Sequence, residues 1–162
     1  MWLKLNLFIK RLFDICSSAC AIVVLLPVWI IVGIWIKTDS KGPILFKQGR
    51  RTKDGRVFKM WKYRSMVVNA ESMGSGLFSY DNDPRITKSG AILRKTSIDE
   101  LPQLINVLKG DISVVGPRPC VTYELGDFDT LNKKYKKRFQ MKGGITGLAQ
   151  CKGRNENSWD EK

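Results

Sequence analysis

The sequence predicts an α+β protein: an N-terminal re-entrant membrane helix broken at a proline, followed by a small, mainly helical domain with a short β-hairpin. Three observations predict this fold. Residues 15–36 contain no charged residue. Lysines and arginines flank this apolar run on both sides. After residue 36 the composition becomes globular, with short β-prone runs between helical patterns. We therefore expect two parts, with an amphipathic lead-in and membrane helix over 1–40 and a cytoplasmic domain over 41–162.

The apolar run would span roughly 30 Å as one helix, which matches the hydrocarbon core of a bilayer. Pro27 lies near its middle, where proline removes a backbone hydrogen bond and breaks or kinks a helix. Basic residues mark the cytoplasmic side of a membrane segment. They occur before the run (Lys4, Lys10, Arg11) and after it (Lys37, Lys41, Lys47, Arg50, Arg51). A hairpin that turns at Pro27 places both clusters on one side, and a kinked span is the alternative.

Two other interpretations of the run are weaker. A signal peptide is disfavoured because no small-x-small cleavage site follows the run. A buried core helix is the other alternative, but residues 23–31 are apolar on all sides, whereas a soluble helix usually keeps one polar face. Before the run, residues 1–14 carry apolar side chains at helical spacing with basic residues between them. This pattern predicts an amphipathic lead-in at the membrane interface, with Lys10, Arg11, Lys37 and Lys41 at the headgroups.

The remaining elements follow from local signals. Ile44–Phe46 and Val57–Tyr63 are β-prone, and residues 52–55 offer a hairpin turn. Residues 69–85 are polar and Gly-rich, which predicts a mobile loop with a turn at Asp83-Pro84. Further predictions are a short helix from Thr87 to about Lys95, a helix from Ser97 to Lys109-Gly110, a strand over Ile112–Val115, a helix over Leu131–Met141 and a turn over Gly143–Gly147.

The amino-acid composition limits which partners and which kinds of catalytic site the chain can have. The net charge of +13 indicates anionic partners such as nucleic acid, anionic lipid or a phosphorylated substrate. The four cysteines form no CxxC pair, which argues against zinc. The chain has no histidine, so Ser-His-Asp, Cys-His and His-metal chemistry are excluded. A general base has to be a carboxylate, lysine, tyrosine or cysteine.

One group of residues is a candidate catalytic site. Ser97 and Glu100 have the spacing of a capping box, so Asp99 and Glu100 could simply complement the helix dipole. The functional alternative is a phosphate site, because a helix N-terminus binds anions through its outward-pointing amides. There a carboxylate can attack phosphorus and a second one can hold Mg²⁺. Arg94, Lys95 and Arg118 could supply further positive charge for a diphosphate.

Several motifs, in chain order, resemble the bacterial sugar transferase family, the monotopic polyprenyl-phosphate phosphoglycosyl transferases. They are KRLFD at 10–14, FKQGR at 46–50, FKMWKYRSM at 58–66, DPR at 83–85, RKTSIDELPQL at 94–104, NVLKGD at 106–111, VGPRP at 115–119 and GITGLAQ at 144–150. One such motif alone would be weak evidence for the family. The ordered series covers nearly the whole chain and is therefore specific evidence for it.

The resemblance implies a reaction. Enzymes of this family move a phosphosugar from a UDP-sugar to polyprenyl (undecaprenyl) phosphate and release UMP. The product starts a surface glycan such as exopolysaccharide, capsule or O-antigen. The family's nucleophile, which forms a covalent phosphosugar intermediate, matches Asp99, and the glutamate that assists with Mg²⁺ matches Glu100. Phosphate-binding positions match Arg94 and Arg118, and further substrate contacts are carried over to Lys59, Lys62, Arg64 and Arg154.

The resemblance also implies a place and partners. We expect the cytoplasmic face of a bacterial inner membrane, contact with membrane lipids and no nucleic-acid partner, with a homo-oligomer left open. Two features depart from the family. Its membrane helix often breaks at Ser-Pro, whereas this chain has Leu26-Pro27, and its members usually continue beyond the position of Lys162. The second departure predicts a C-terminally truncated chain. Alternatives are an inactive family fragment or a non-enzymatic, membrane-anchored basic module that binds anionic lipid or nucleic acid.

Overall fold

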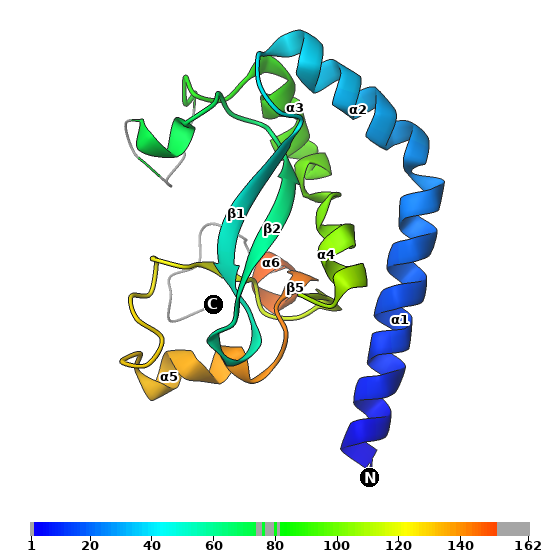
Figure 1. Cartoon of the computed structure of the whole chain (residues 1–162), viewed down its shortest axis with the longest axis vertical. Helices are drawn as coiled ribbons and strands as arrows, with labels where there is room; N and C mark the ends of the chain where they lie inside the picture. The colour runs from blue at the N-terminus through cyan, green and yellow to red at the C-terminus, as the bar shows by residue number, and fades with distance from the viewer. Residues whose placement is uncertain (1, 74–75, 77–79, 81, 152–162) are drawn as a thin grey trace. The chain divides into compact units, whose positions relative to one another are not determined.

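Two separately packed units make up the chain in the computed structural model, which describes residues 2–73, 76, 80 and 82–151 (Figure 1). Unit 1 comprises Met1–Ile22, Lys47–Met60 and Gln103–Lys162, and unit 2 comprises Val23–Phe46 and Trp61–Pro102. The helices are α1 (Trp2–Val24), α2 (Leu26–Asp39), α3 (Lys88–Thr96), α4 (Gln103–Lys109), α5 (Lys133–Lys136) and α6 (Leu148–Cys151). The strands are β1 (Leu45–Arg51), β2 (Val57–Tyr63), β3 (Ser113–Val115), β4 (Cys120–Val121) and β5 (Gly144–Thr146).

The predicted break in the apolar run is confirmed, but it lies at Leu25, two residues before the proline. α1 continues from the lead-in without interruption to Val24, and α2 then begins at Leu26. Pro27 falls in the first turn of α2, where a missing N–H costs nothing. It also cannot donate to the carbonyl four residues earlier, so one continuous helix is disfavoured.

No single helix in the described part of the chain is long and apolar enough to cross a membrane. The pair Leu5–Val24 and Leu26–Asp39 meets that test together, by length and composition, with a 62° bend at the break. Many of its large apolar side chains are exposed, including Phe8 at 67%, Val23 at 72% and Ile31 at 64%. These exposed side chains argue against a fully buried core helix, although Val32 and Ile36 of α2 are buried.

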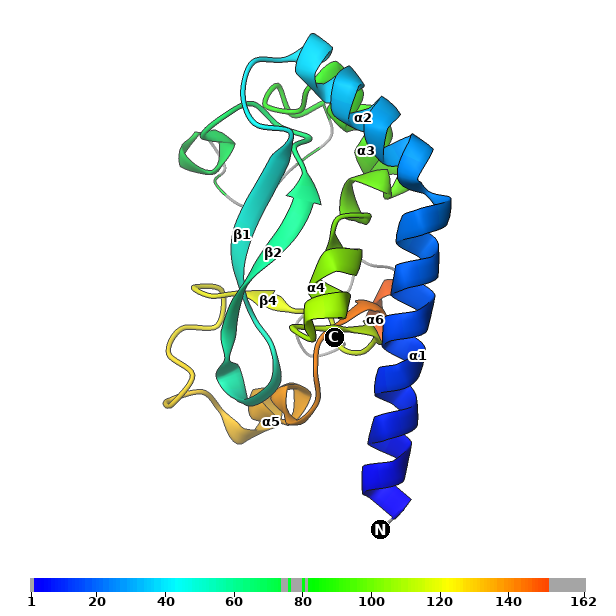
Figure 2. The same cartoon turned by 45° about the vertical axis from the view of Figure 1, so that its right-hand side comes forward.

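Unit 2 has a core built from Val32, Ile36, Tyr63 and Leu93. α2 and α3 lie side by side in this unit (Figures 1 and 2). The N-terminus of α3 approaches the preceding segment so closely that a Cβ on Gly90 would lie 1.9 Å from the carbonyl oxygen of Ser65. Thr87 caps α3 by accepting from the amide of Gly90, so the predicted short helix and its start are confirmed.

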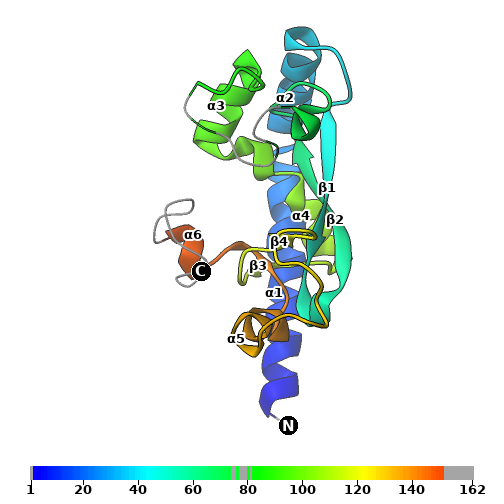
Figure 3. The same ribbon diagram turned by 90° about the vertical axis from the view of Figure 1, so that its left-hand side faces the viewer.

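Unit 1 has its own core of Phe58, Met60, Val107 and Ile112. The predicted hairpin is confirmed, with Asp54 and Gly55 at positive φ in its turn. β4 extends the hairpin's sheet antiparallel to β1 (Figure 3), and β3 pairs with β5 in parallel.

Two local predictions for the later part of the chain were wrong in detail. Residues 143–147 contain strand β5 rather than only a turn, because Ser113 and Val115 supply a partner strand 31 residues earlier. Residues 131–141 form only the short α5 and a 3₁₀ turn over Lys137–Gln140. The loop prediction at 69–85 falls partly outside the described residues, and the described part includes a 3₁₀ turn over Ala70–Ser72.

Candidate functional site

Asp99 and Glu100 occupy a 3₁₀ turn, Ile98–Glu100, between α3 and α4. Only 7% of Asp99 and 8% of Glu100 is exposed. Two buried, adjacent carboxylates are unusual, because taking a charge out of water costs free energy unless other groups stabilise it. The turn is held in place on both sides, since Ile98 and Leu101 pack against the core of unit 2.

The predicted capping box is wrong. Ser97 ends α3 in a left-handed conformation (φ 60°), and its side chain makes no cap hydrogen bond to the following turn. The predicted helix from Ser97 is therefore divided: a 3₁₀ turn comes first, and α4 begins only at Gln103, directly after Pro102. Leu101, before the proline, keeps helical dihedral angles, but Pro102 has no N–H to donate to a preceding carbonyl, and proline suits the start of a helix.

Glu100 has a cationic partner on β2. The ammonium group of Lys62 donates to Oε1 of Glu100 over 3.1 Å, and both side chains are largely buried, at 16% and 9% exposure. The ion pair offsets part of the free-energy cost of burying the Glu100 carboxylate. Tyr63, the next residue, is not a candidate base: burial raises the pKa of Tyr63 to about 12, so its phenol keeps its proton and donates to the carbonyl of Trp29.

Arg94 lies in the last turn of α3, half-buried, three residues before Ser97. It contributes a positive potential at Asp83. Asp83 forms a buried pair with Arg85, whose Nη2 lies 2.7 Å from Oδ2 of Asp83. Hydrogen bonds from Arg85 hold the pKa of Asp83 below its ordinary value. Arg85 also donates to the carbonyls of Ala70, Met73 and Gly76, so it organises the segment that precedes it.

Arg64 has a structural task in this arrangement. Arg64 is 5% exposed, and its guanidinium donates to the carbonyls of Ile36, Ser40 and Lys41. These carbonyls lie at the C-terminal end of α2, where a cation also stabilises the helix dipole. The substrate contact predicted for Arg64 stays a prediction.

The other predicted substrate contacts divide between the two units. Unit 2 contains Asp99, Glu100, Lys62, Arg64 and Arg94, whereas Lys59 and Arg118 belong to unit 1. Lys59 is exposed on β2. Arg118, between two prolines, is half-buried, and its carbonyl accepts a 2.7 Å hydrogen bond from Arg138. Arg154 lies outside the described residues.

The residues at 99 and 100 fit a magnesium ion in type. Mg²⁺ is commonly bound through one or two carboxylates together with waters and substrate phosphates. Asp99 and Glu100 supply two carboxylates, and the described part of the chain contains no cluster of three or more His, Cys, Asp or Glu side chains suited to a metal.

Sequence reasoning missed how α1 is attached to unit 1. Lys10 donates to Ser113, and Arg11 donates to the carbonyls of Val107 and Leu108 at the end of α4. Asp14, 3% exposed, accepts from Oγ of Ser113 at 2.9 Å and from the amide of Val114 at 3.0 Å. Lys10 and Arg11 were expected at lipid headgroups, which stays a prediction, and the structure adds these contacts to unit 1. The one sequence signal for this attachment is the spacing of Lys10, Arg11 and Asp14, which places the three charged side chains on one face of α1.

Comparison with known proteins agrees with the motifs. A profile of the family described as "Bacterial sugar transferase" matches residues 5–162. The chain is 46% identical to the exopolysaccharide production protein PSS of Rhizobium leguminosarum bv. phaseoli, over 92% of this chain and 76% of that protein. It is 43% identical to the UDP-glucose:undecaprenyl-phosphate glucose-1-phosphate transferase of Klebsiella pneumoniae, over 98% of this chain.

The Klebsiella protein is much longer, and the match spans only 34% of it. A third relative, the uncharacterized sugar transferase EpsL of Bacillus subtilis (strain 168), is 41% identical over 96% of this chain and 74% of its own length. None of these three relatives is described as a nucleic-acid-binding or lipid-binding module, and no described contact favours that alternative.

Proposed function

Since the chain belongs to the bacterial sugar transferase family, we propose that it transfers a sugar phosphate from a UDP-sugar to undecaprenyl phosphate and releases UMP. The observation that carries this proposal is the pair of adjacent, buried carboxylates at 99 and 100, in a turn bordered by the cations Arg94 and Lys62. Phosphoryl transfer is catalysed mainly by positioning and by charge stabilisation, and this turn offers both.

The first step is assigned to Asp99. A carboxylate oxygen of Asp99 attacks the phosphorus that bears the sugar, a new O–P bond forms, and the bond to the UMP oxygen breaks. The product is a covalent aspartyl phosphosugar. In the second step a phosphate oxygen of undecaprenyl phosphate attacks the same phosphorus, and the carboxylate of Asp99 leaves. The rigid turn, fixed by Ile98 and Leu101, keeps the nucleophile in one orientation for both steps.

Glu100 and the cations support this chemistry. Lys62 keeps the carboxylate of Glu100 in a fixed position and balances its charge. Mg²⁺, held by Glu100 and Asp99, would neutralise negative charge on the phosphate oxygens. Arg94 adds positive charge that favours a diphosphate near the turn.

The location follows from the substrates and the apolar helices. One substrate is a lipid phosphate and the other is a water-soluble nucleotide, so the reaction belongs at the headgroup plane. The exposed apolar side chains of α1 and α2 suit contact with lipid, as a re-entrant pair at the cytoplasmic face of the bacterial inner membrane. Labelling of single cysteines placed at residues 4 and 41 tests this: a flank that reacts only from the periplasm would exclude the re-entrant arrangement.

The activity is tested with the whole chain in membranes or detergent. UDP-glucose, UDP-galactose and UDP-N-acetylgalactosamine are each supplied with undecaprenyl phosphate and Mg²⁺, and UMP release is measured. We expect turnover with one of them and, without the acceptor, a mass increase of one phosphosugar on the protein.

Asp99→Asn should abolish both signals and keep the fold, because the amide is nearly the same shape but a poor nucleophile. Asp127→Asn, at an exposed carboxylate, is the matched control and should turn over normally. Normal turnover by the Asp99→Asn protein would refute the assigned role.

A further inference from the structure

The helix α2 has two faces with different surroundings. Val32 and Ile36 are buried in the core of unit 2, whereas Ile30, Ile31 and Ile34 lie on the opposite side of the helix and are exposed. The turn that carries the candidate carboxylates rests on the same core, because two apolar side chains of that segment pack there. One face of α2 thus supports the turn, and the opposite, apolar face suits contact with lipid.

Asp39 ends α2 and is hydrogen-bonded to the start of α3. Its Oδ2 accepts from the amide of Ser89 at 2.9 Å and from Oγ of Ser89 at 2.8 Å. Ser89 is fully buried, and Asp39 is half-buried. A carboxylate in this position satisfies an amide that has no partner inside the helix, and the helix dipole favours its charge. α2 and α3 are therefore joined by charge-assisted hydrogen bonds as well as by apolar packing.

α3 carries this attachment to the carboxylate pair. It runs from Lys88 to Thr96, and the turn over Ile98–Glu100 begins after one intervening residue. Leu93, in the middle of α3, is fully buried in the core to which α2 contributes. A short helix in a densely packed core moves as one body, so the position of its start relative to α2 affects the position of the turn.

Removal of the contact at Asp39 would leave the turn's own geometry in place. The hydrogen bond from Lys62 to Glu100 involves neither α2 nor α3. Arg64 also keeps its hydrogen bonds to the carbonyls of Ile36 and Ser40, so α2 stays attached to unit 2. The expected consequence is a looser position of the turn relative to α2, and not a loss of the fold.

The two substrates of the proposed reaction respond differently to such a change. A UDP-sugar is dissolved in water and reaches Asp99 from solution at any height of the turn. The phosphate of undecaprenyl phosphate is held in the headgroup plane by its lipid chain, so it reaches Asp99 only when the turn lies at the height of that plane. A misplacement of about 1 Å is enough to slow a reaction roughly a hundredfold.

We propose that Asp39 is a positioning residue for the second step of the reaction. By joining the end of α2 to the start of α3, it keeps the turn at the height at which a phosphate oxygen of the lipid attacks the phosphorus on Asp99. The bond from that oxygen to phosphorus forms and the bond to the Asp99 carboxylate breaks, and no proton or electron passes through Asp39. The inference rests on the proposed function and on the placement of α2 in lipid.

Separate kinetics of the two steps test the proposal, with the whole chain in lipid nanodiscs that contain undecaprenyl phosphate. Because a covalent intermediate separates the steps, kcat/KM for the UDP-sugar reports the first step and kcat/KM for the lipid phosphate reports the second. In Asp39→Ala we expect kcat/KM for the lipid phosphate to fall about tenfold or more, and kcat/KM for the UDP-sugar to stay within about twofold. Equal falls in both values indicate a general structural role and would overturn the proposal, as would two unchanged values.

Two variants at the same contact show whether the hydrogen bonds are responsible. Asp39→Asn keeps an oxygen that accepts from the amide of Ser89, so most of the kcat/KM for the lipid phosphate should be retained. Ser89→Ala removes only the Oγ donor and should lower that kcat/KM about threefold, which also provides the test if Asp39→Ala unfolds. A loss in Asp39→Asn as large as in Asp39→Ala, or no fall in Ser89→Ala, overturns the proposal.

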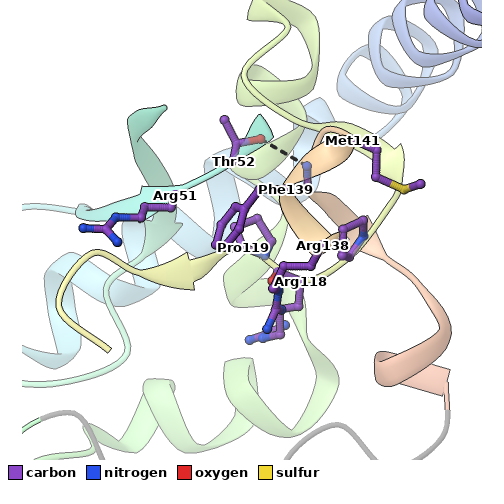
Figure 4. Close-up of a pocket in the computed structure, with 9 residues that line it drawn as sticks. Arg51, Thr52, Arg118, Pro119, Arg138, Phe139 and Met141 are labelled. Carbon is purple, nitrogen blue, oxygen red and sulfur yellow. Dashed lines mark hydrogen bonds between the residues drawn. The ribbon is translucent and has the colours of Figure 1, made fainter. Parts of the chain in front are cut away.

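Unit 1 supplies matched controls. Asp14 accepts from the same kinds of donor, a serine Oγ and a backbone amide, but it binds α1 to β3. Oγ1 of Thr52 accepts from the amide of Gly143 at 3.1 Å beside a small pocket, as the dashed line in Figure 4 marks. Asp14→Ala and Thr52→Val should lower the thermal midpoint without a selective loss of kcat/KM for the lipid phosphate. The same selective loss in either control would overturn the assignment to Asp39.

The first step distinguishes failure of the inference from failure of the proposed function. If the original protein releases no UMP from any UDP-sugar and gains no phosphosugar without acceptor, the proposed function fails and the inference fails with it. If the original protein completes both steps and Asp39→Ala matches it, the proposed function stands and only the role of Asp39 is overturned.

Discussion

Lys62 and Glu100 are joined by a 3.1 Å hydrogen bond between two largely buried side chains. The two residues are 38 positions apart, one on β2 and the other in the turn that carries Asp99. The contact therefore fixes both the charge balance and the orientation of the carboxylate pair. It also gives Lys62 a role next to the predicted nucleophile that does not require direct contact with substrate.

Replacing Lys62 should weaken both stability and activity. Lys62→Met leaves the carboxylate of Glu100 without this cation, and breaking such a pair costs about 3 kcal/mol. We expect a lower thermal midpoint and UMP release reduced about tenfold or more, because the turn at 98–100 loses its orientation. Differential scanning fluorimetry and a UMP assay measure the two effects. Lys53→Met, at an exposed lysine, is the control, and an unaltered Lys62→Met protein would contradict the assignment.

Asp14 should anchor α1 to β3. Asp14→Ala removes the acceptor for Oγ of Ser113 and for the amide of Val114, which should cost about 2 kcal/mol in the free energy of unfolding. A double-mutant cycle with Ser113→Ala, followed by chemical denaturation, measures the coupling. Non-additive losses support the contact, whereas fully additive losses argue against it. Asp129→Ala, at an exposed position, should leave stability nearly unchanged.

Two glycines in unit 2 should respond to alanine in opposite directions. A Cβ on Gly90 would lie 1.9 Å from the backbone oxygen of Ser65, so α3 would have to move. We expect Gly90→Ala to destabilise the fold by about 3 kcal/mol or more. In Gly33→Ala, inside α2, the new Cβ meets only Ile44 at an ordinary 3.7 Å. That variant should be stabilised by about 0.5–1 kcal/mol through helix propensity.

Thermal midpoints of the two glycine variants in one detergent provide the comparison. A thermal midpoint of Gly90→Ala that is not lowered would contradict the close approach of α3 to Ser65, and a lowered midpoint of Gly33→Ala would contradict the open space beside Gly33.

Acid should destabilise unit 2 through Asp83. Its folded-state pKa is lowered by hydrogen bonds from Arg85, so its stabilising contribution is fully present above the unfolded pKa of about 3.9. The contribution is lost as the pH falls through the lower, folded-state pKa. We expect the thermal midpoint to decline below about pH 4.

Asp83→Asn should show a shallower decline over the same range, because the amide does not titrate. Hydrogen bonds from Ser89 also lower the pKa of Asp39, so Asp39 adds to the loss of stability over the same pH range. The thermal midpoint of Asp39→Asn is therefore measured as well. An identical slope in the original and Asp83→Asn proteins would exclude the pair as a source of the acid sensitivity.

Local signals predicted several elements correctly. The β-hairpin follows from two β-prone runs around a turn with Asp54 and Gly55. The start of α3 follows from Thr87 as an N-cap. The helix break follows from Pro27. Each of these signals acts within a few residues, so the sequence alone is sufficient to recognise it.

The sequence predicted the candidate site less completely than these elements. The identity of Asp99 and Glu100 came from their motif, but the capping box drawn around them was wrong because Ser97 adopts a left-handed conformation that ends α3. Arg64 was expected at the substrate, which stays a prediction, and the structure shows that it binds the end of α2. Nothing in its neighbours along the chain distinguishes these two uses of a guanidinium.

The sequence by itself determined the apolar break at Leu25–Pro27, the hairpin, the start of α3 and the family motifs around Asp99, because propensity, capping and residue order are properties of short segments. Only the tertiary structure decided which distant groups meet: Lys62 with Glu100, Asp14 with Ser113, and Arg138 with Arg118. These contacts join residues 20 to 99 positions apart. Such partners are chosen by the packing of the cores and the pairing of strands, which depends on the whole chain at once rather than on any local pattern.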